Sequence, residues 1–248
     1  MTKSKKPFPH DTLYATEKPK VENFSFNQQV VDVFPDMINR SVPSYQNIID
    51  CVGKMANLLC NSNPIIYDLG CSLGNVSLSI AKHAQSKNPK IKGIDNSSAM
   101  IERCQQHIDA FSFGNSISLK QADLVSVALS PCNMVVINFT LQFIEPTKRQ
   151  NIINKVYRAL EPKGVFVLSE KIELSNAVLN NVLVDLHHEF KRENGYSDLE
   201  ISQKRSALEE VMRLDTVKIH QERLCEAGFS NVCVWYQHFN FVSILAIK

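Results

Sequence analysis

The stretch Tyr67-Asp68-Leu69-Gly70-Cys71-Ser72-Leu73-Gly74 decides the fold, because it joins an apolar run to a stretch of helical periodicity through a turn of small residues. Gly70 permits a tight turn and a close approach of the backbone to a ligand. Gly74 allows the next helix to pack near the strand, and the first N–H groups of that helix are free to bind a ligand. The stretch therefore predicts a strand, a ligand-binding turn and a helix.

Five short apolar runs have the character of buried parallel strands, and stretches of helical periodicity separate them. Parallel strands that helices cover on both faces read as continuous apolar runs. This alternation predicts an α/β, Rossmann-like, mostly parallel sheet with right-handed crossovers. The expected strands are Ile65–Leu69, Lys90–Asp95, Ile117–Gln121, Met134–Phe139 and Val165–Glu170, and the expected helices are Val76–Gln85, Ser97–Ala110 and Thr147–Leu160.

The alternation stops after the fifth strand. Residues 176–226 read as a helical insertion, and the runs Val232–Phe239 and Phe241–Ile247 follow with almost nothing between them. These two runs must pair antiparallel, because a parallel crossover needs a dozen residues or more. The sequence thus predicts a seven-stranded sheet with an antiparallel C-terminal edge pair, a layout that resembles class I methyltransferase folds.

The chain of 248 residues can hold one sizeable domain. We expect residues 1–23 to be a disordered N-terminal segment and residues 24–248 to form a single ligand-binding domain. The basic N-terminus is not followed by the apolar run of a signal peptide, and no run is long enough to span a membrane.

Composition favours a soluble protein with a small-molecule substrate. Hydrophobic residues make up 44% and charged residues 21%, and the net charge is only +2, with Lys and Arg spread along the chain. Direct nucleic-acid binding is therefore not expected. The seven cysteines are scattered without a CxxC pair, which favours a reducing, cytoplasmic compartment. We expect no metal, because adjacent His187 and His188 would point about 100° apart on a helix.

Polar side chains stand where the expected strands end. Asp95 closes the second strand, where a carboxylate can accept both hydroxyls of a ribose; the next residues, Asn96 and Ser97, would also suit a helix cap. Asp123 ends the third strand, where turn formation is the alternative, and Asn138 closes the fourth. Because open α/β sheets bind ligands at the carboxyl ends of their strands, these positions predict one site.

The turn itself indicates the ligand. An NAD-type turn would read G-x-G-x-x-G. Here Asp68 stands two positions before Gly70, which resembles the S-adenosylmethionine pattern of class I methyltransferases. Ser72 replaces a third glycine that is common in that pattern, and serine is small enough to fit.

Arg205 lies in an expected helix, Leu199–Met212, on the same stripe as Ile201 and Leu208. A guanidinium on an apolar face must pair with an anion or reach solvent. A core carboxylate would satisfy it, and so would the carboxylate of a ligand, which matches its planar fork. The pattern leaves both interpretations open.

Several long runs of unusual residues closely resemble the carboxy-S-adenosyl-L-methionine synthase family, bacterial relatives of the methyltransferases. The resemblance extends over nearly the whole chain after about residue 24. The runs are Val33–Ile38, Arg40–Pro43, Tyr67–Gly74, Asn138–Phe143, Asn194–Ser197 and Glu200–Ser206.

This resemblance implies a reaction in which S-adenosylmethionine and prephenate give carboxy-S-adenosylmethionine, phenylpyruvate and water. It also implies a homodimer, and a partner enzyme that transfers the carboxymethyl group to a hydroxylated wobble uridine of tRNA. Arg205 resembles the catalytic arginine of the family, which pairs with the new carboxylate. The other cofactor-binding residues that the resemblance implies are Tyr45, Gly70, Cys71, Ser72, Asp95, Asn96, Asp123, Leu124 and Asn138.

The implied chemistry needs a dry pocket and a positioned cation more than a protein nucleophile. The sequence offers no obvious general base, so we expect a substrate-derived group to take the methyl proton. Two alternatives remain: a methyltransferase that acts on a small molecule or RNA, and a non-catalytic cofactor-binding subunit of a tRNA-modifying enzyme.

Overall fold

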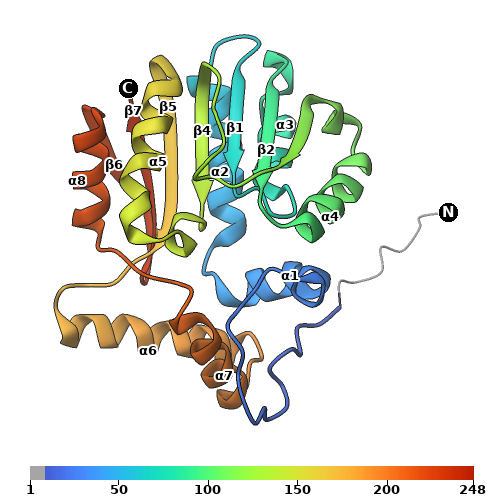
Figure 1. Cartoon of the computed structure of the whole chain (residues 1–248), viewed down its shortest axis with the longest axis vertical. Coiled ribbons are helices and arrows are strands. Elements are labelled where there is room, and N and C mark those ends of the chain that lie inside the picture. Colours follow the sequence, from blue (N-terminus) through green and yellow to red (C-terminus); the bar gives the residue numbers. More distant parts are fainter. Residues whose placement is uncertain (1–8) are drawn as a thin grey trace.

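The computed structural model describes residues 9–248, and within them a seven-stranded sheet forms the centre of the molecule (Figure 1). The strand order is β3-β2-β1-β4-β5-β7-β6, and β7 runs antiparallel to the other six strands. The strands are β1 (Ile65–Leu69), β2 (Lys90–Asp95), β3 (Ile117–Gln121), β4 (Cys132–Asn138), β5 (Leu160–Lys171), β6 (Asn231–His238) and β7 (Phe241–Ile247).

Helices cover both faces of this sheet. Met134 and Val136 of β4 belong to a core with α2 and α3, whereas Val135 and Ile137 belong to a core with α5 and α8. Alternate residues of β4 therefore point into two different cores, which explains why this strand contains a continuous apolar run. The helices are α2 (Tyr45–Leu59), α3 (Asn75–His83), α4 (Ser98–Asp109), α5 (Pro146–Ala159) and α8 (Val217–Ala227), and the short 3-10 helices are Gln85–Lys87, Ser112–Ser116 and Leu141–Phe143.

The helical insertion and the first helix form a separate layer. The helices α1 (Gln28–Ser41), α6 (Ala177–Glu193) and α7 (Asp198–Glu209) lie below the sheet in Figure 1. A capping box begins α7: the Ser197 hydroxyl accepts the backbone N–H of Glu200, and the Glu200 carboxylate accepts the backbone N–H of Ser197. Such a box satisfies N–H groups that a helix start leaves free, so it fixes where α7 begins.

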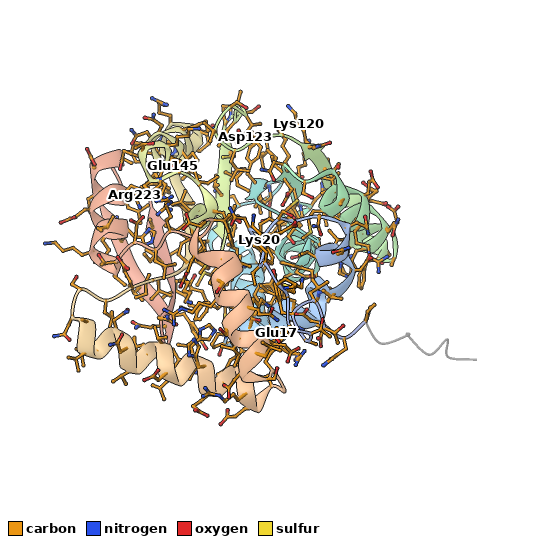
Figure 2. The ribbon with its side chains drawn as sticks, turned by 60° about the horizontal axis from the view of Figure 1, so that its bottom comes forward. Glu17, Lys20, Lys120, Asp123, Glu145 and Arg223 are labelled. Carbon is orange, nitrogen blue, oxygen red and sulfur yellow. The ribbon has the colours of Figure 1, made fainter. Side chains whose placement is uncertain are left out.

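Residues 9–23 are not disordered, so this part of the prediction is wrong. They lie along the insertion, where the Gln203 amide donates to the carbonyls of Tyr14 and Thr16 at 2.9 Å each and accepts from the backbone N–H of Lys18. Asp11 is almost fully buried. Backbone groups make most of these contacts, so no apolar pattern marks the segment. Figure 2 shows this segment through Glu17 and Lys20, over the middle of the molecule. The rest of the expected disordered segment, residues 1–8, lies outside the described residues.

The predicted fold class is confirmed, and the bounds of β1, β2, β3 and β7 are those predicted. Among the strands, the largest difference is β5, which begins at Leu160 rather than at Val165. Leu160 pairs with Cys132 and Val165 pairs with Met134, so the intervening residues loop out of the ladder as a bulge. Among the described residues no helix is both long and apolar enough to cross a bilayer.

Candidate active site

A cavity of about 370 Å³ lies between the carboxyl ends of the strands and the layer formed by α1, α6 and α7. The topology places it at the switch point between β1 and β4, where doubly wound sheets bind ligands. It brings together every residue that the sequence predicted for cofactor binding except Arg205. These lining residues are Tyr45, Gly70, Cys71, Ser72, Asp95, Asn96, Asp123, Leu124 and Asn138.

The turn after β1 has the backbone that its glycines predict. Gly70 has φ +81°, and a Cβ there would lie 2.2 Å from the Thr140 hydroxyl oxygen. Ser72, at the position of the missing glycine, also has a left-handed φ of 50°. A non-glycine residue adopts this conformation at a cost of about 1 kcal/mol. Gly74 is needed for a different reason from the one predicted: a Cβ there would lie 2.7 Å from Cys104 Sγ of α4.

Asp68, the acidic residue before the turn, fixes the start of α3. One carboxylate oxygen accepts the backbone N–H of Ser77 at 3.1 Å and its hydroxyl at 2.7 Å. Burial is the main cause that raises the pKa of Asp68 to about 6. The side chain also lines the cavity, although the sequence reasoning used it as part of the motif and not as a site residue.

Asp95 ties the turn to the start of α4. Its Oδ2 accepts the backbone N–H of Ser72 at 2.9 Å, and its Oδ1 accepts that of Ser97 at 3.0 Å. Each carboxylate oxygen has a second lone pair for a ligand. Burial raises the pKa of this carboxyl. The Ser97 hydroxyl accepts the backbone N–H of Met100 and so caps α4, as the helix-cap interpretation predicted. Asn96 instead lines the cavity.

Asp123 both forms a turn and lines the cavity. Its carboxylate accepts the backbone N–H of Val125 at 2.8 Å, as the turn interpretation predicted. Lys155 holds the same loop by donating to the Val127 carbonyl at 2.8 Å. The loop therefore presents Asp123 and Leu124 to the cavity from a fixed backbone.

Asn138 carries the clearest sign of a ligand. Its side-chain Oδ1 is buried and has no hydrogen-bond partner among residues 9–248. A buried acceptor without a donor costs roughly 1–3 kcal/mol. Since Asn138 lines the cavity at the end of β4, a donor from a ligand would remove this cost. With the carboxylate of Asp95 and the turn at Gly70, the residues present fit the polar groups of S-adenosylmethionine.

Aromatic rings connect the cofactor side of the cavity to its other end. Tyr45 lies 6.2 Å from Phe139 between ring centroids, Phe139 lies 5.9 Å from Phe241, and Phe241 lies 4.9 Å from His187. Burial raises the pKa of Tyr45 to about 12, so this phenol stays neutral. The rings form an apolar wall along the cavity.

Three lysines line the far end of the cavity, and the sequence reasoning missed them. Lys171 ends β5, Lys191 lies on α6 and Lys204 lies on α7. Burial is the main cause that lowers the pKa of Lys191 to about 7, and that of Lys171 and Lys204 to about 8. A helical wheel could have found Lys204, which lies one turn after the buried Ile201.

Of these lysines, only Lys204 has a carboxylate within ion-pair distance in the described part of the chain, and that carboxylate is Asp11 at 3.5 Å. Nearby His187 donates from Nε2 to the Ser41 carbonyl at 2.8 Å. Burial lowers the pKa of His187 far below its usual value, so the ring is neutral. The far end of the cavity therefore carries an excess of buried positive charge.

Arg205 does not lie on a buried apolar face, so that prediction is wrong. Its side chain is 62% exposed and pairs with Glu209 at 3.3 Å. The buried stripe of α7 runs through Ile201, Lys204 and Ala207, which turns Arg205 toward solvent. The positive charge of Arg205 contributes to the lowered pKa of both Lys171 and Lys191. It therefore lies within electrostatic range of the cationic end, and its contact with a ligand carboxylate stays a prediction.

No group of three or more His, Cys, Asp or Glu side chains within residues 9–248 is arranged to hold a metal ion. His187 and His188 have ring centroids 6.4 Å apart, and the hydrogen bond to Ser41 occupies one nitrogen of His187.

Comparisons with known proteins agree with this geometry. Residues 66–164 match a family described as a methyltransferase domain. Among solved structures, human N-acetylserotonin methyltransferase has a TM-score of 0.60 at 15% identity, over 89% of this chain and 55% of that one. An O-methyltransferase family protein from Burkholderia thailandensis has a TM-score of 0.65 at 12% identity, over 90% and 60%. These structures show the class I methyltransferase fold.

Two relatives are similar over almost their whole length. The carboxy-S-adenosyl-L-methionine synthase of Colwellia psychrerythraea is 48% identical over 238 residues, which cover 96% of this chain and 98% of the relative. That of Alteromonas mediterranea is 48% identical over 239 residues, with the same coverage. The chain therefore belongs to the carboxy-S-adenosyl-L-methionine synthase family.

Proposed function

We propose that this enzyme converts S-adenosyl-L-methionine and prephenate to carboxy-S-adenosyl-L-methionine, phenylpyruvate and water. The relatives' names support the carboxylated product. The observation that carries the proposal is the convergence of the predicted cofactor residues from β1, β2, β4 and α2 on one cavity. That cavity also has a cationic end, which suits an anionic second substrate.

Four residues would hold S-adenosylmethionine. Asp95 would accept the ribose hydroxyls with the lone pairs that Ser72 and Ser97 leave free. Asp123, on its fixed loop, would meet the edge of the adenine, and the unpaired Oδ1 of Asn138 would accept a ligand N–H. The buried ring of Tyr45 would close the site with an apolar wall, which keeps water away from the reacting methyl group.

The reaction balances without a protein base. Loss of the ring carboxylate of prephenate as carbon dioxide leaves an electron pair that aromatises the ring and expels its hydroxyl group. This hydroxyl takes a proton from the methyl group beside the sulfonium and leaves as water. The resulting ylide carbon attacks the carbon dioxide, and the new C–C bond completes the carboxymethyl group. The protein holds both substrates together and excludes water, which supplies much of the rate by proximity.

Arg205 would pair with the new carboxylate. Because its side chain is 62% exposed and lies outside the cavity of its own chain, such a contact requires either a shift of α7 or a second copy of the chain. The relevant test is the loss of carboxylation in an Arg205 variant that still binds S-adenosylmethionine.

The function is tested by the mass of the ligand. Purified protein incubated with S-adenosylmethionine and prephenate should yield a ligand heavier by the mass of one carbon dioxide, together with phenylpyruvate. A parallel incubation without prephenate should yield only unmodified S-adenosylmethionine. If both incubations give unmodified ligand, a methyltransferase or a non-catalytic subunit would be the better assignment.

We also propose that the enzyme is a cytoplasmic homodimer whose product is used by a tRNA carboxymethyltransferase, without direct nucleic-acid binding of its own. A stripe on α6 supports the dimer, because its apolar side chains are unusually exposed for a monomer. These side chains are Val178 (73%), Leu179 (57%), Val182 (50%) and Leu186 (42%). Val182→Asp should give a monomer in size-exclusion chromatography with light scattering, whereas a dimer that persists would exclude this face.

A further inference from the structure

Two ammonium groups at the far end of the cavity stand without a counter-charge. Lys171 at the end of β5 is partly buried, and Lys191 on α6 is only 7% exposed. Both line the cavity, and within residues 9–248 neither has a carboxylate within ion-pair distance. A buried charge is costly unless it is paired. Two such groups side by side therefore indicate a site for an anion.

The surrounding groups do not neutralise this charge. Lys204 is paired with Asp11 at 3.5 Å, so that carboxylate is already occupied. His187 and His188 on α6 add no negative charge, and Arg205 on α7 adds a positive one. The carboxylates of Asp11 and Asp36 act on Lys204, which leaves Lys171 and Lys191 without a negative neighbour among the described residues.

We infer that Lys171 and Lys191 bind the carboxylate of the three-carbon side chain of the second substrate, the one that phenylpyruvate retains. This inference rests on the proposed function, in which the second substrate is prephenate. It assigns the two lysines as specificity residues for that substrate.

The chemistry selects this carboxylate over the one on the ring. The ring carboxylate leaves as neutral carbon dioxide, so a cation paired with it would stabilise the ground state more than the transition state and slow the reaction. The side-chain carboxylate keeps its charge throughout. A pair of lysines on it binds the substrate without opposing the decarboxylation.

The aromatic wall gives the ring of this substrate a place next to the lysines. The ammonium of Lys171 lies 5.8 Å from the centroid of the Phe241 ring, and that ring packs at 5.9 Å on Phe139, which packs on Tyr45. A phenyl group that lies along these rings extends from the cationic end toward the cofactor side. Its carboxylate would then meet the lysines while its ring faces the cofactor.

The experiment measures binding of phenylpyruvate to the whole protein by calorimetry, in the presence of S-adenosylmethionine. Lys191→Met and Lys171→Met should each weaken phenylpyruvate binding by about tenfold or more, the usual effect of a lost charge-assisted hydrogen bond. Lys218→Met, at a lysine that is 83% exposed on α8, is the matched control and should not change it. Phenylacetone, which lacks the carboxylate, should bind the unmodified protein and the three variants with the same affinity.

The two failures are distinguishable. Unchanged phenylpyruvate affinity in both cavity variants would overturn the lysine site, and so would an equal loss of S-adenosylmethionine affinity, which would assign the lysines to the cofactor. Lysine-dependent phenylpyruvate binding without formation of the carboxylated product from prephenate would overturn the reaction and leave the anion site standing. Replacing an unpaired buried ammonium by an apolar side chain removes a desolvation cost, and Lys191→Gln serves if the Met variant does not fold.

Discussion

The ammonium group of Lys204 lies 3.5 Å from the carboxylate of Asp11, and both side chains are buried. Lys204 also donates to the Ser41 hydroxyl at 3.0 Å, and Tyr196 donates its phenol to Asp11. The pair joins α7 to the segment before α1. The N-terminal segment thus supplies the counter-charge for one wall of the cavity, which no motif in that segment predicted.

Asp11→Asn should destabilise the protein by about 3 kcal/mol, because removing one partner of a buried ion pair leaves the other uncompensated. The free energy of unfolding from denaturant titration measures this loss. The loss should be smaller at high pH, since burial already lowers the pKa of Lys204 to about 8 and the unpaired ammonium can give up its proton.

The matched control for this variant is Glu17→Gln, an exposed carboxylate on the same segment (Figure 2). It should change the free energy of unfolding by no more than about 0.5 kcal/mol. Equal stability of the Asp11 and Glu17 variants would show that the ion pair between Asp11 and Lys204 contributes nothing to the free energy of unfolding.

The sheet could be predicted because each of its central strands is buried on both faces. That burial makes Met134–Ile137 of β4 a continuous apolar run, and the polar last residues of β2 and β4, Asp95 and Asn138, mark the ligand edge. The residues on the cofactor side of the cavity can therefore be predicted from short segments of sequence, each at the end of one strand.

The cationic end of the cavity could not be predicted in the same way. Lys171, Lys191 and Lys204 come from three elements, and only the packing of the insertion on the sheet brings them together. The expected apolar stripe of α7, with Ile201 and Leu208, lies one position away from the buried one, so the sequence predicts Arg205 rather than Lys204. Helical periodicity of a short helix with few apolar residues fixes a face only approximately.

Asp95→Asn should weaken S-adenosylmethionine binding by about tenfold to a hundredfold, because hydrogen bonds to a charged group are worth roughly 1.5–3 kcal/mol. The carboxylate also holds the turn through Ser72 at 2.9 Å, so its neutral form would loosen the turn as well. Calorimetry with the cofactor alone measures this affinity. Asp109→Asn, an exposed residue on α4, is the control, and equal losses in both variants would contradict a direct role for Asp95.

Arg205→Leu should abolish carboxylation while S-adenosylmethionine affinity and thermal stability stay almost unchanged. Its pair with Glu209 is exposed at both ends, and such helix pairs contribute only about 0.3–0.5 kcal/mol. Product mass, calorimetry and melting temperature separate the three effects. Glu209→Gln breaks the same pair and should keep the activity, so a loss in both variants would point to the helix surface rather than to the guanidinium.

Phenylpyruvate binding should weaken as pH rises from about 6 to about 9, because the two cavity lysines then lose their protons. Burial lowers the pKa of Lys191 to about 7 and that of Lys171 to about 8, so both are cationic at the lower limit and neutral at the upper. Burial lowers the pKa of both His187 and His188, so neither ring gains charge as the pH rises. Lys204, whose pKa burial lowers to about 8, is paired with Asp11 rather than free to bind the anion. Calorimetry across this range measures the effect.

The double variant of Lys171 and Lys191 to Met should flatten this profile. In Lys171→Met alone, the remaining transition should move to higher pH, because the charge of Lys171 contributes to the lowered pKa of Lys191.

The pH profile also separates anion binding by Lys191 from base catalysis by Lys191. A neutral Lys191 that took the methyl proton would make the rate rise through the pKa of that amine, whereas a lysine that binds the substrate carboxylate makes the affinity fall there. A rate that rises with pH and an affinity that does not change would assign Lys191 as the base and contradict the anion site.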